Sequence, residues 1–541
     1  MPVVREAAPA VPVGEMSGDL PAEPERLDWH VPDPTRAREI IDQRIAEGIA
    51  TKADRIYYDS LGERIGLIAR PQQRVLTLSD ALRQAMLHSF AVRVASYNPA
   101  VETARIVEAE AAFDATFFSN LIKNKQNIPV ATSLLGSNTD TLTMNWGITK
   151  LLPSGMQATT RVDLQRQFTD NVFQSLNPAW NSGFVVELRQ PLLRGFGIDF
   201  NRSMIRLARL DHRISAHAFR RQVITTLVNV EKAYWDLIRA RREVVISGRL
   251  LASFEMIYDY LWQRREFDAY KIQIAETKAR LERTKAQFVQ VLANVRNAED
   301  RLINLMNLPD LDLADQIEII PVDFPSQMPV VLDRLSEVQS ALDHRPELHE
   351  ASLNVKRAKV AVGQAENQAL PKFDLTFRYT VNGLGPSAHD AFSEVSKNDF
   401  HEYYISMELE LPIGNRLRRA QTRQARLRHA QTIARLKQAF EDVILDVNLQ
   451  VRNVQTSFDQ IGPEFQSAEA NEDQVDAIRA RAESKSFVQL SQELNALQAL
   501  AASRRTLLKS VVDYTVAIIE LERAKGTLPE FNNVILDDAV E

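Results

Sequence analysis

"QPLLRGFG", at residues 190–197, joins two segments whose hydrophobic periods differ. The segment before it, NSGFVVEL, alternates like a β-strand, with Phe184, Val186 and Leu188 on one face. The segment after it begins at about residue 203 and has the apolar spacing of one helix of about sixty residues, or roughly 90 Å. A proline and two glycines separate the two patterns. The sequence therefore predicts a sheet that turns directly into a very long helix.

Apolar residues of the predicted long helices recur at alternating steps of four and three. Val223, Leu227, Val230, Tyr234 and Leu237 follow this spacing, which is typical of a coiled-coil seam. Similar stretches recur further along the chain. We predict four long helices, at residues 203–262, 271–307, 416–482 and 487–527.

Period-two alternation marks two strand regions, at residues 113–193 and 370–413. In the second region, Tyr403, Ile405 and Leu409 alternate with polar residues. The polar face there consists of Tyr404, Ser406, Glu408 and Glu410. We count two strands in each half of the chain, plus an added hairpin around LPSG that either lengthens strands or decorates the surface.

The order of elements repeats after about 220 residues. Pro191 and Pro412 each close a strand before a long helix, and LINLMNLP and LERAKGTLP each close a second long helix. These matched landmarks indicate duplication. The predicted parts are an N-terminal extension (1–75, partly disordered), a first repeat (76–310), a linker (311–330), a second repeat (331–530) and a C-terminal tail (531–541).

Composition excludes several classes of function. The chain of 541 residues has no cysteine, so disulfides, thiolate metal sites and a cysteine nucleophile are excluded. A net charge of −6, with basic residues spread along helices, argues against nucleic acid as a partner. No phosphate loop, HExxH or GxSxG motif occurs, and His344 and His349 flank a proline in poor ligand geometry. We expect neither an enzyme nor a cofactor or metal site.

Two observations bear on membranes. No apolar run of 18 residues occurs, so no transmembrane helix is expected, and the N-terminus lacks the basic and apolar regions of a signal peptide. However, the predicted helices continue the strands instead of covering them, so the apolar strand face needs another partner, for which lipid is the natural candidate. Four strands per chain are too few for a membrane barrel, whereas three chains supply twelve.

Several stretches together resemble the TolC family of outer-membrane efflux channels. They are SGFVVELRQPLLRGFG, NRSMIRLA and VNVEKAYWDLIRA in the first half, and the region from PELHEASLNVKRA to LPKFDLTFRY, LPIGN and DYTVAIIELERAKGTLP in the second. The resemblance covers residues 76–530. It implies a mainly α protein with β-strands: a homotrimer with a twelve-stranded barrel among outer-membrane lipids and an α-helical tunnel through the periplasm of a Gram-negative-type bacterium. It also implies an efflux or type I secretion role with a periplasmic adaptor and an inner-membrane RND or ABC transporter.

The resemblance assigns roles to particular residues. The barrel-to-helix joint is Pro191, Gly195, Gly197, Pro412 and Gly414, and the lumen of the barrel includes Ser406, Glu408 and Glu410, which suggest a mild cation preference. The positions that often carry gating acids in the family are Gln492 and Asn495 here, which predicts a polar amide constriction, although amides that only face solvent or a neighbouring helix remain an alternative. The adaptor-docking tips are Phe267, Asp268, Tyr270, Lys485 and Ser486.

A soluble coiled-coil scaffold is the alternative function. The coiled-coil spacing supports it, because helices of this kind need no ligand. It does not explain why alternating strands occur in both halves of the chain. Within the channel interpretation, the sequence does not identify the cargo.

Overall fold

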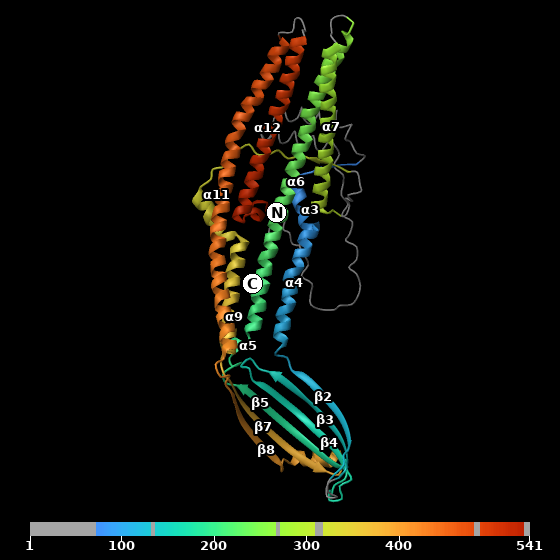
Figure 1. The fold of residues 1–541 in the computed structure, drawn as a ribbon, viewed down its shortest axis with the longest axis vertical. Coiled ribbons are helices and arrows are strands. Elements are labelled where there is room, and N and C mark those ends of the chain that lie inside the picture. Colours follow the sequence, from blue (N-terminus) through green and yellow to red (C-terminus); the bar gives the residue numbers. More distant parts are fainter. Residues whose placement is uncertain (1–71, 131–135, 267–270, 309–316, 481–486, 535–541) are drawn as a thin grey trace. The chain divides into compact units, whose positions relative to one another are not determined.

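The computed structural model describes residues 72–130, 136–266, 271–308, 317–480 and 487–534. These residues form two compact units, which are described separately (Figure 1). We call residues 99–216 and 349–437 the sheet unit, and residues up to 98, 217–348 and 438 onward the helical unit.

The sheet unit contains one antiparallel sheet of six strands in the order β2-β3-β4-β5-β7-β8. The strands are β2 (Thr116–Asn127), β3 (Asn138–Leu151), β4 (Gln157–Thr169), β5 (Ala179–Pro191), β7 (Lys372–Gly385) and β8 (His401–Glu410). Each strand neighbours the next in the chain except at β5 and β7, where the two predicted repeats meet. The sheet therefore joins strands from both halves of the chain (Figure 1).

The number of strands differs from the expected four. The LPSG hairpin neither lengthens existing strands nor decorates the surface, because its two arms are β3 and β4 and both lie inside the sheet. Periodicity predicted strands throughout this region but did not show how many of them pair within one sheet. Strand pairing depends on contacts between residues distant in sequence. One chain thus contributes six strands.

Side chains alternate consistently across the sheet, because residues opposite each other in an antiparallel pair point to the same face. The pairings Thr149–Thr159, Thr159–Glu187 and Glu187–Arg378 belong to one such row. The face containing this row is polar. The other face is apolar and includes Leu142, Met144, Trp146, Ile148, Val162, Leu164, Phe184, Val186, Leu188, Phe373, Leu375, Phe377, Tyr379, Val381, Tyr403, Ile405, Met407 and Leu409.

One short helix packs on the apolar face. α10 (Ala388–Lys397) contacts β5 and β7, and the ring centroids of Phe392 and Trp146 are 6.4 Å apart. Gly383 makes this approach possible, because a Cβ atom there would lie 2.1 Å from the carbonyl oxygen of Ala391. The outward side chains of α10 are polar, so it covers only the end of the sheet with a hydrophilic surface.

The long helices match the sequence prediction closely. They are α6 (Ser203–Gln263), α7 (Lys271–Met306), α11 (Arg416–Ala480) and α12 (Phe487–Lys525). Two further helices, α4 (Phe90–Ala111) and α9 (Pro346–Gln368), precede the strands of the two repeats. Asn307 and Gly526, which follow the second long helix of each predicted repeat, both have positive φ. Among the described helices, none has the long, nearly uncharged apolar stretch that crossing a membrane requires.

The helical unit has apolar cores between its helices. It also contains α3 (Leu78–His88), α8 (Arg334–His344), α13 (Leu528–Phe531) and the parallel strand pair β1 (Gln72–Leu76) and β6 (Ile317–Pro321). The seam residues Val223, Leu227, Val230, Tyr234 and Leu237 are all buried, which confirms the seam predicted from their spacing. The hydroxyl of Tyr234 donates to Asp323 (2.7 Å) and lies 3.0 Å from the carbonyl oxygen of Leu76, so this seam also anchors the small sheet.

A buried charge cluster ties the small sheet to the helices. Arg241 of α6 donates to Glu299 of α7 at 3.3 Å and to Glu318 of β6 at 2.7 Å, and it also bonds the carbonyl of Ile319 at 3.0 Å. Because both carboxylates are fully buried, removing the arginine would leave buried charge without its counterion. The cluster holds β6 in a defined position against α6 and α7.

Glu231 of α6 is a buried carboxyl in the helical unit. It is 1% exposed, and the side-chain nitrogen of Asn532 donates to its Oε1 at 2.7 Å. Burial raises the pKa of Glu231 from 4.5 to about 7, against the opposing effect of this hydrogen bond. The folded state therefore holds the proton more tightly than the unfolded state. Protonation stabilises the fold fully below about pH 4.5, and this contribution is lost as the pH rises through about 7.

We predict that Glu231→Gln raises the thermal unfolding midpoint at pH 8 and leaves it nearly unchanged at about pH 4.5. The amide mimics the protonated acid, so the gain at pH 8 approaches at most about 3 kcal/mol. Circular dichroism melts of both proteins across this pH range measure the effect, with Glu469→Gln on an exposed part of α11 as the control. Equal gains at both ends of the range would contradict the assignment of this proton to Glu231.

Candidate functional site

The polar face of the sheet carries ion pairs that link neighbouring strands. Arg378 of β7 lies 2.8 Å from Glu187 of β5, and Arg189 of β5 lies 2.7 Å from Asp374 of β7. Arg378 also lies over the ring of Tyr404, 5.2 Å from its centroid. These charges lie at the end of the sheet where β5 and β8 run into the long helices, since Glu187 and Arg189 are among the last residues of β5.

The predicted lumen residues Ser406, Glu408 and Glu410 lie on this polar face. The two acids are partly compensated, however. The ammonium of Lys372 lies 2.5 Å from Glu408, and the guanidinium of Arg194 lies 3.8 Å from Glu410. Since basic side chains accompany the carboxylates, the face is a mixed-charge surface, which weakens the argument from Glu408 and Glu410 for a cation preference.

The strand-to-helix joint is held by side-chain amides. Gly195 and Gly197 have φ values of 87° and 105°, which glycine adopts without the steric cost that other residues bear. Asn201 donates to the carbonyls of both glycines at 2.9 Å, and Asn367 accepts from the amide of Gly195 at 2.8 Å and donates to the carbonyl of Phe196 at 3.0 Å. The redirected backbone therefore has hydrogen-bond partners from two different helices.

The LPSG turn packs against the same joint. The carbonyl of Ser154 accepts from the amide of Gly197 at 3.2 Å, and its hydroxyl donates to Gln190 at 3.2 Å. Gly155 lies so close that a Cβ atom there would be 2.5 Å from the carbonyl oxygen of Gly195. In the second repeat the joint is simpler: Gly414 has a φ of 83°, and Asn415 donates to the carbonyl of Ala369 at 2.8 Å.

The two predicted gate amides are exposed side chains on α12. Gln492 and Asn495 are three residues apart and so share one helix face. Asn495 accepts a 2.6 Å hydrogen bond from Arg280 of α7, and Arg280 also pairs with Glu276 at 2.9 Å. The nearby acid Glu493 is occupied by Arg479 of α11 at 2.8 Å. One amide of the pair is therefore held by a neighbouring helix of the same chain.

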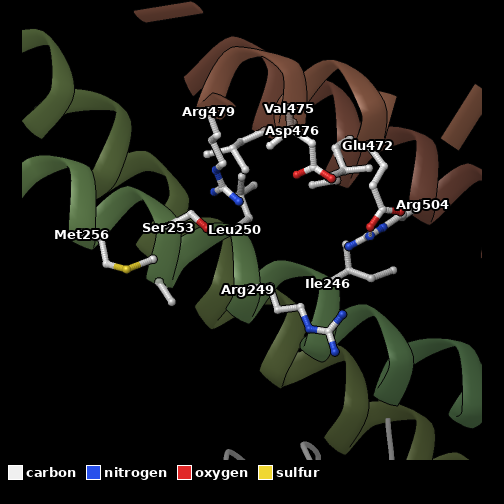
Figure 2. A pocket seen from close by; sticks show the side chains of 14 residues that line it. Ile246, Arg249, Leu250, Ser253, Met256, Glu472, Val475, Asp476, Arg479 and Arg504 are labelled. Carbon is white, nitrogen blue, oxygen red and sulfur yellow. Dashed lines mark hydrogen bonds and ion pairs between the residues drawn. The ribbon is translucent and has the colours of Figure 1, made fainter. Parts of the chain in front are cut away.

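The predicted docking residues Phe267, Asp268, Tyr270, Lys485 and Ser486 lie outside the described residues. Close to them in sequence, the helical unit has a groove of about 280 Å³ between α6, α11 and α12 (Figure 2). Its floor is apolar and its rim is charged. The labelled residues are Ile246, Arg249, Leu250, Ser253, Met256, Glu472, Val475, Asp476, Arg479 and Arg504. Arg504 closes one side of the groove through a 2.6 Å hydrogen bond to Glu472.

Sequence reasoning missed several residues of these sites. Asn201 lies four residues after Gly197, so an asparagine beside a glycine turn was an available signal, whereas Asn367 lies far from the first joint in the sequence and carried no such signal. Ser154 and Arg280 act across large sequence separations, and no local pattern marks them. No cluster of three or more metal-binding side chains occurs in the described ranges.

Comparison with known proteins gives consistent matches. A family model described as outer membrane efflux protein matches residues 338–527. The outer membrane protein TolC of Vibrio cholerae is 23% identical over 325 residues, which cover 56% of this chain and 68% of TolC.

Solved structures extend the likeness to most of the chain. VceC, an outer membrane protein of Vibrio cholerae, has a TM-score of 0.60 at 14% identity and covers 83% of this chain and 96% of its own. The CmeC outer membrane channel of Campylobacter jejuni has a TM-score of 0.60 at 14% identity, with coverages of 83% and 86%. At these identities the likeness to solved structures concerns the fold.

We predict that Gly155→Ala destabilises the joint by about 1–2 kcal/mol or more, because φ is 92° there and the added methyl meets the backbone of Gly195. The thermal unfolding midpoint of the purified protein measures the loss. The matched control is Gly363→Ala in α9, where nothing lies within 4 Å and alanine favours the helix by about 1 kcal/mol. The unfolding midpoint is expected to fall for Gly155→Ala and to rise for Gly363→Ala. An unchanged midpoint for Gly155→Ala would contradict close packing of the LPSG turn on the joint.

Proposed function

Because this chain belongs to the outer membrane efflux protein family, we propose that three copies of it form the exit duct of an envelope-spanning export machine. The sheets form a barrel in the outer membrane, and the long helices form a tunnel in the periplasm. The chain is not an enzyme, since channels of this family pass their cargo without chemical change. The matches give no support to a soluble coiled-coil scaffold.

One observation of this chain carries the proposal most directly. The apolar face of the sheet is largely uncovered: Ile148, Ile405, Met407 and Leu409 are each more than half exposed. Among the described helices, only α10 makes substantial contact with the sheet. An exposed apolar face of this size marks an interaction surface, and a polar face opposite it suits water. Lipid against the apolar face and an aqueous lumen against the polar face give each face a matching environment.

The duct is passive in this proposal, because a channel wall offers no energy source. An inner-membrane transporter, of the RND or ABC type, drives the cargo, and a periplasmic adaptor joins it to the duct. Relatives of this kind are described as efflux channels, which supports such partners in general terms.

The barrel lumen does not select strongly by charge. Arg378, Arg189 and Lys372 lie beside the carboxylates of the polar face at ion-pair distances. Paired charges on a water-filled wall leave a small net field, which salt screens further. Discrimination between cargoes therefore falls to the transporter and to the periplasmic constriction.

The constriction is formed by Gln492 and Asn495, repeated in each copy around the tunnel. Both amides are exposed in the single chain, and Gln492 can face the tunnel axis beside Asn495 on the same helix face. Arg280 fixes Asn495 through its 2.6 Å hydrogen bond and thereby holds α12 against α7. The closed state is stabilised by polar contacts of this kind, without a ring of carboxylates.

We predict that Gln492→Ala/Asn495→Ala increases single-channel conductance severalfold in a planar bilayer, because shorter side chains widen the narrowest part of the tunnel. Arg280→Ala is expected to increase it as well, since Asn495 then loses its anchor. The control is Thr506→Ala, which shortens an exposed side chain of α12 about three turns from Asn495. Unchanged conductance in all variants would agree with a channel but would show that its constriction lies at other residues. Protein that folds without detergent and never conducts would refute the duct itself.

The groove between α6, α11 and α12 is the proposed docking place for the adaptor. Its apolar floor, including Leu250 and Val475, suits the apolar stripe of a partner helix. Its charged rim, with Arg249 and Asp476 on different helices, suits a partner with matching charges (Figure 2).

We predict that a photo-reactive residue at Arg249 forms a covalent adduct in living cells with a periplasmic adaptor, which mass spectrometry identifies. The same residue at Lys509, exposed on α12 outside the groove lining, is the control and should give no such adduct. Adaptor adducts at Lys509 but none at Arg249 would move the docking place away from the groove.

A further inference from the structure

The six-stranded sheet ends in two long edge strands, β2 and β8. Their side chains are almost all exposed on both faces, and the exposed group includes Phe117, Leu121, Ile405 and Leu409. Unpaired strand edges are not stable in a membrane, because no water is present to satisfy the backbone groups. Each edge therefore requires another strand.

The two edges are suited to each other. Neighbouring strands alternate in direction and the number of strands is even, so β2 and β8 run in opposite directions. The β8 edge of one copy can therefore pair with β2 of the next copy in the same antiparallel manner as inside the sheet. A second copy of this chain is thus the occupant that the edge geometry fits.

The register between copies follows from the slope of the sheet. The row that begins at Thr116 in β2 ends at Tyr404 in β8, and β8 continues six residues further to Glu410. If β2 of the next copy starts level with the end of β8, Thr116 lies opposite Glu410. The same register then places Leu121 opposite Ile405, both on apolar faces, and Asn120 opposite Ser406, both on polar faces. The apolar faces of the two copies lie on the same side, and so do their polar faces, because the pairing between copies is shifted by six residues, an even number.

This register also gives an acceptable strand tilt. A stagger of six residues across six strands corresponds to a tilt of about 35°, from a rise of about 3.3 Å per residue and a strand spacing of about 4.8 Å. Membrane barrels have tilts of roughly 35–45°. Because the stagger is set by the six strands of each copy, the tilt is the same for any number of copies, and the level-ended register of β2 on β8 agrees with a membrane barrel.

We infer that the outlet is a barrel of eighteen strands, six from each of three copies, and that the β3–β4 hairpin is the element that widens it. This inference rests on the proposed function, which supplies the three copies. Because barrel diameter grows roughly linearly with strand number, the outlet is about 1.5 times as wide as one of twelve strands. A barrel of this size leaves an open aqueous channel and admits bulkier solutes than a barrel of twelve strands.

Cysteine cross-linking tests the pairing, since the chain has no natural cysteine. Asn120→Cys/Ser406→Cys brings two thiols together on the polar face, within the Cα separation that disulfides accept. Mild oxidation should yield a covalent trimer on a non-reducing gel. Two further double variants, Asn120→Cys/Tyr404→Cys and Asn120→Cys/Glu408→Cys, test registers that are shifted by two residues in either direction. The control, Asn120→Cys/Ile405→Cys, places the thiols on opposite faces and should not cross-link.

A deletion tests the role of the hairpin. Asn124, Thr141, Gln167 and Ala179 share one row, so replacing residues 125–178 by Asn-Gly joins β2 to β5 with the faces and register preserved. Polyethylene glycols of graded size, added from the extracellular side of a bilayer, reduce conductance only when they enter the outlet. The largest polymer that enters should be smaller for the variant, in line with an outlet narrower by about a third. An unchanged cut-off would overturn the inference.

The outcomes separate this inference from the proposed function. A protein of trimeric mass that conducts but gives no cross-link in any of the three registers would overturn the eighteen-stranded barrel and leave the duct in place. A covalent ring of another copy number would also overturn it. A protein with neither oligomer nor conductance would refute the duct itself. Where the deletion variant fails to assemble, the cross-linking result decides alone.

Discussion

Consistent alternation across six antiparallel strands is the constraint on which the rest of the molecule depends. The registers keep apolar residues such as Met144, Phe377 and Ile405 on one face and charged residues such as Arg378 on the other. Exceptions such as Lys123, Asp140 and Arg166 lie at the ends of β2, β3 and β4 remote from the joint. No described helix other than α10 covers the apolar face substantially, so the sheet is incomplete in water. A membrane against the apolar face and a water-filled lumen against the polar face give each face of the sheet a suitable environment.

The change from strand to helix is the second requirement, and its chemistry is local. A strand that ends at a membrane surface leaves backbone groups without ladder partners, and each needs a substitute. At the first joint, Asn201 and Asn367 supply four hydrogen bonds to the glycine-rich turn. The second joint has the shorter PIGN sequence and a single asparagine contact from Asn415. The first joint needs more support because it also receives the LPSG turn.

Sequence periodicity predicted the long helices to within about two residues at most of their ends, since a seam such as Val223 to Leu237 repeats over many turns and leaves little ambiguity. It also placed Glu408 on the polar face and identified the joint glycines. It could not predict that β3 and β4 enter the sheet, because strand pairing depends on residues far apart in the chain. For the same reason it missed Arg280 beside Asn495 and Lys372 beside Glu408, and so overestimated the acidity of the lumen face.

The extra hairpin shows why such a wall changes by two strands at a time. One inserted strand would reverse the direction of β5 and bring its end to the wrong side of the membrane, so that QPLLRGFG could not lead into α6. Two strands restore the direction, and the row that links Thr116, Thr149, Thr159 and Glu187 shows that they also preserve the faces. The insertion therefore keeps the direction of β5 into the joint and adds contacts from its LPSG turn to the joint backbone. The width of the sheet can change while β5 still leads into α6, because strand direction depends on an even number of inserted strands and the faces depend on the register of the inserted pairs.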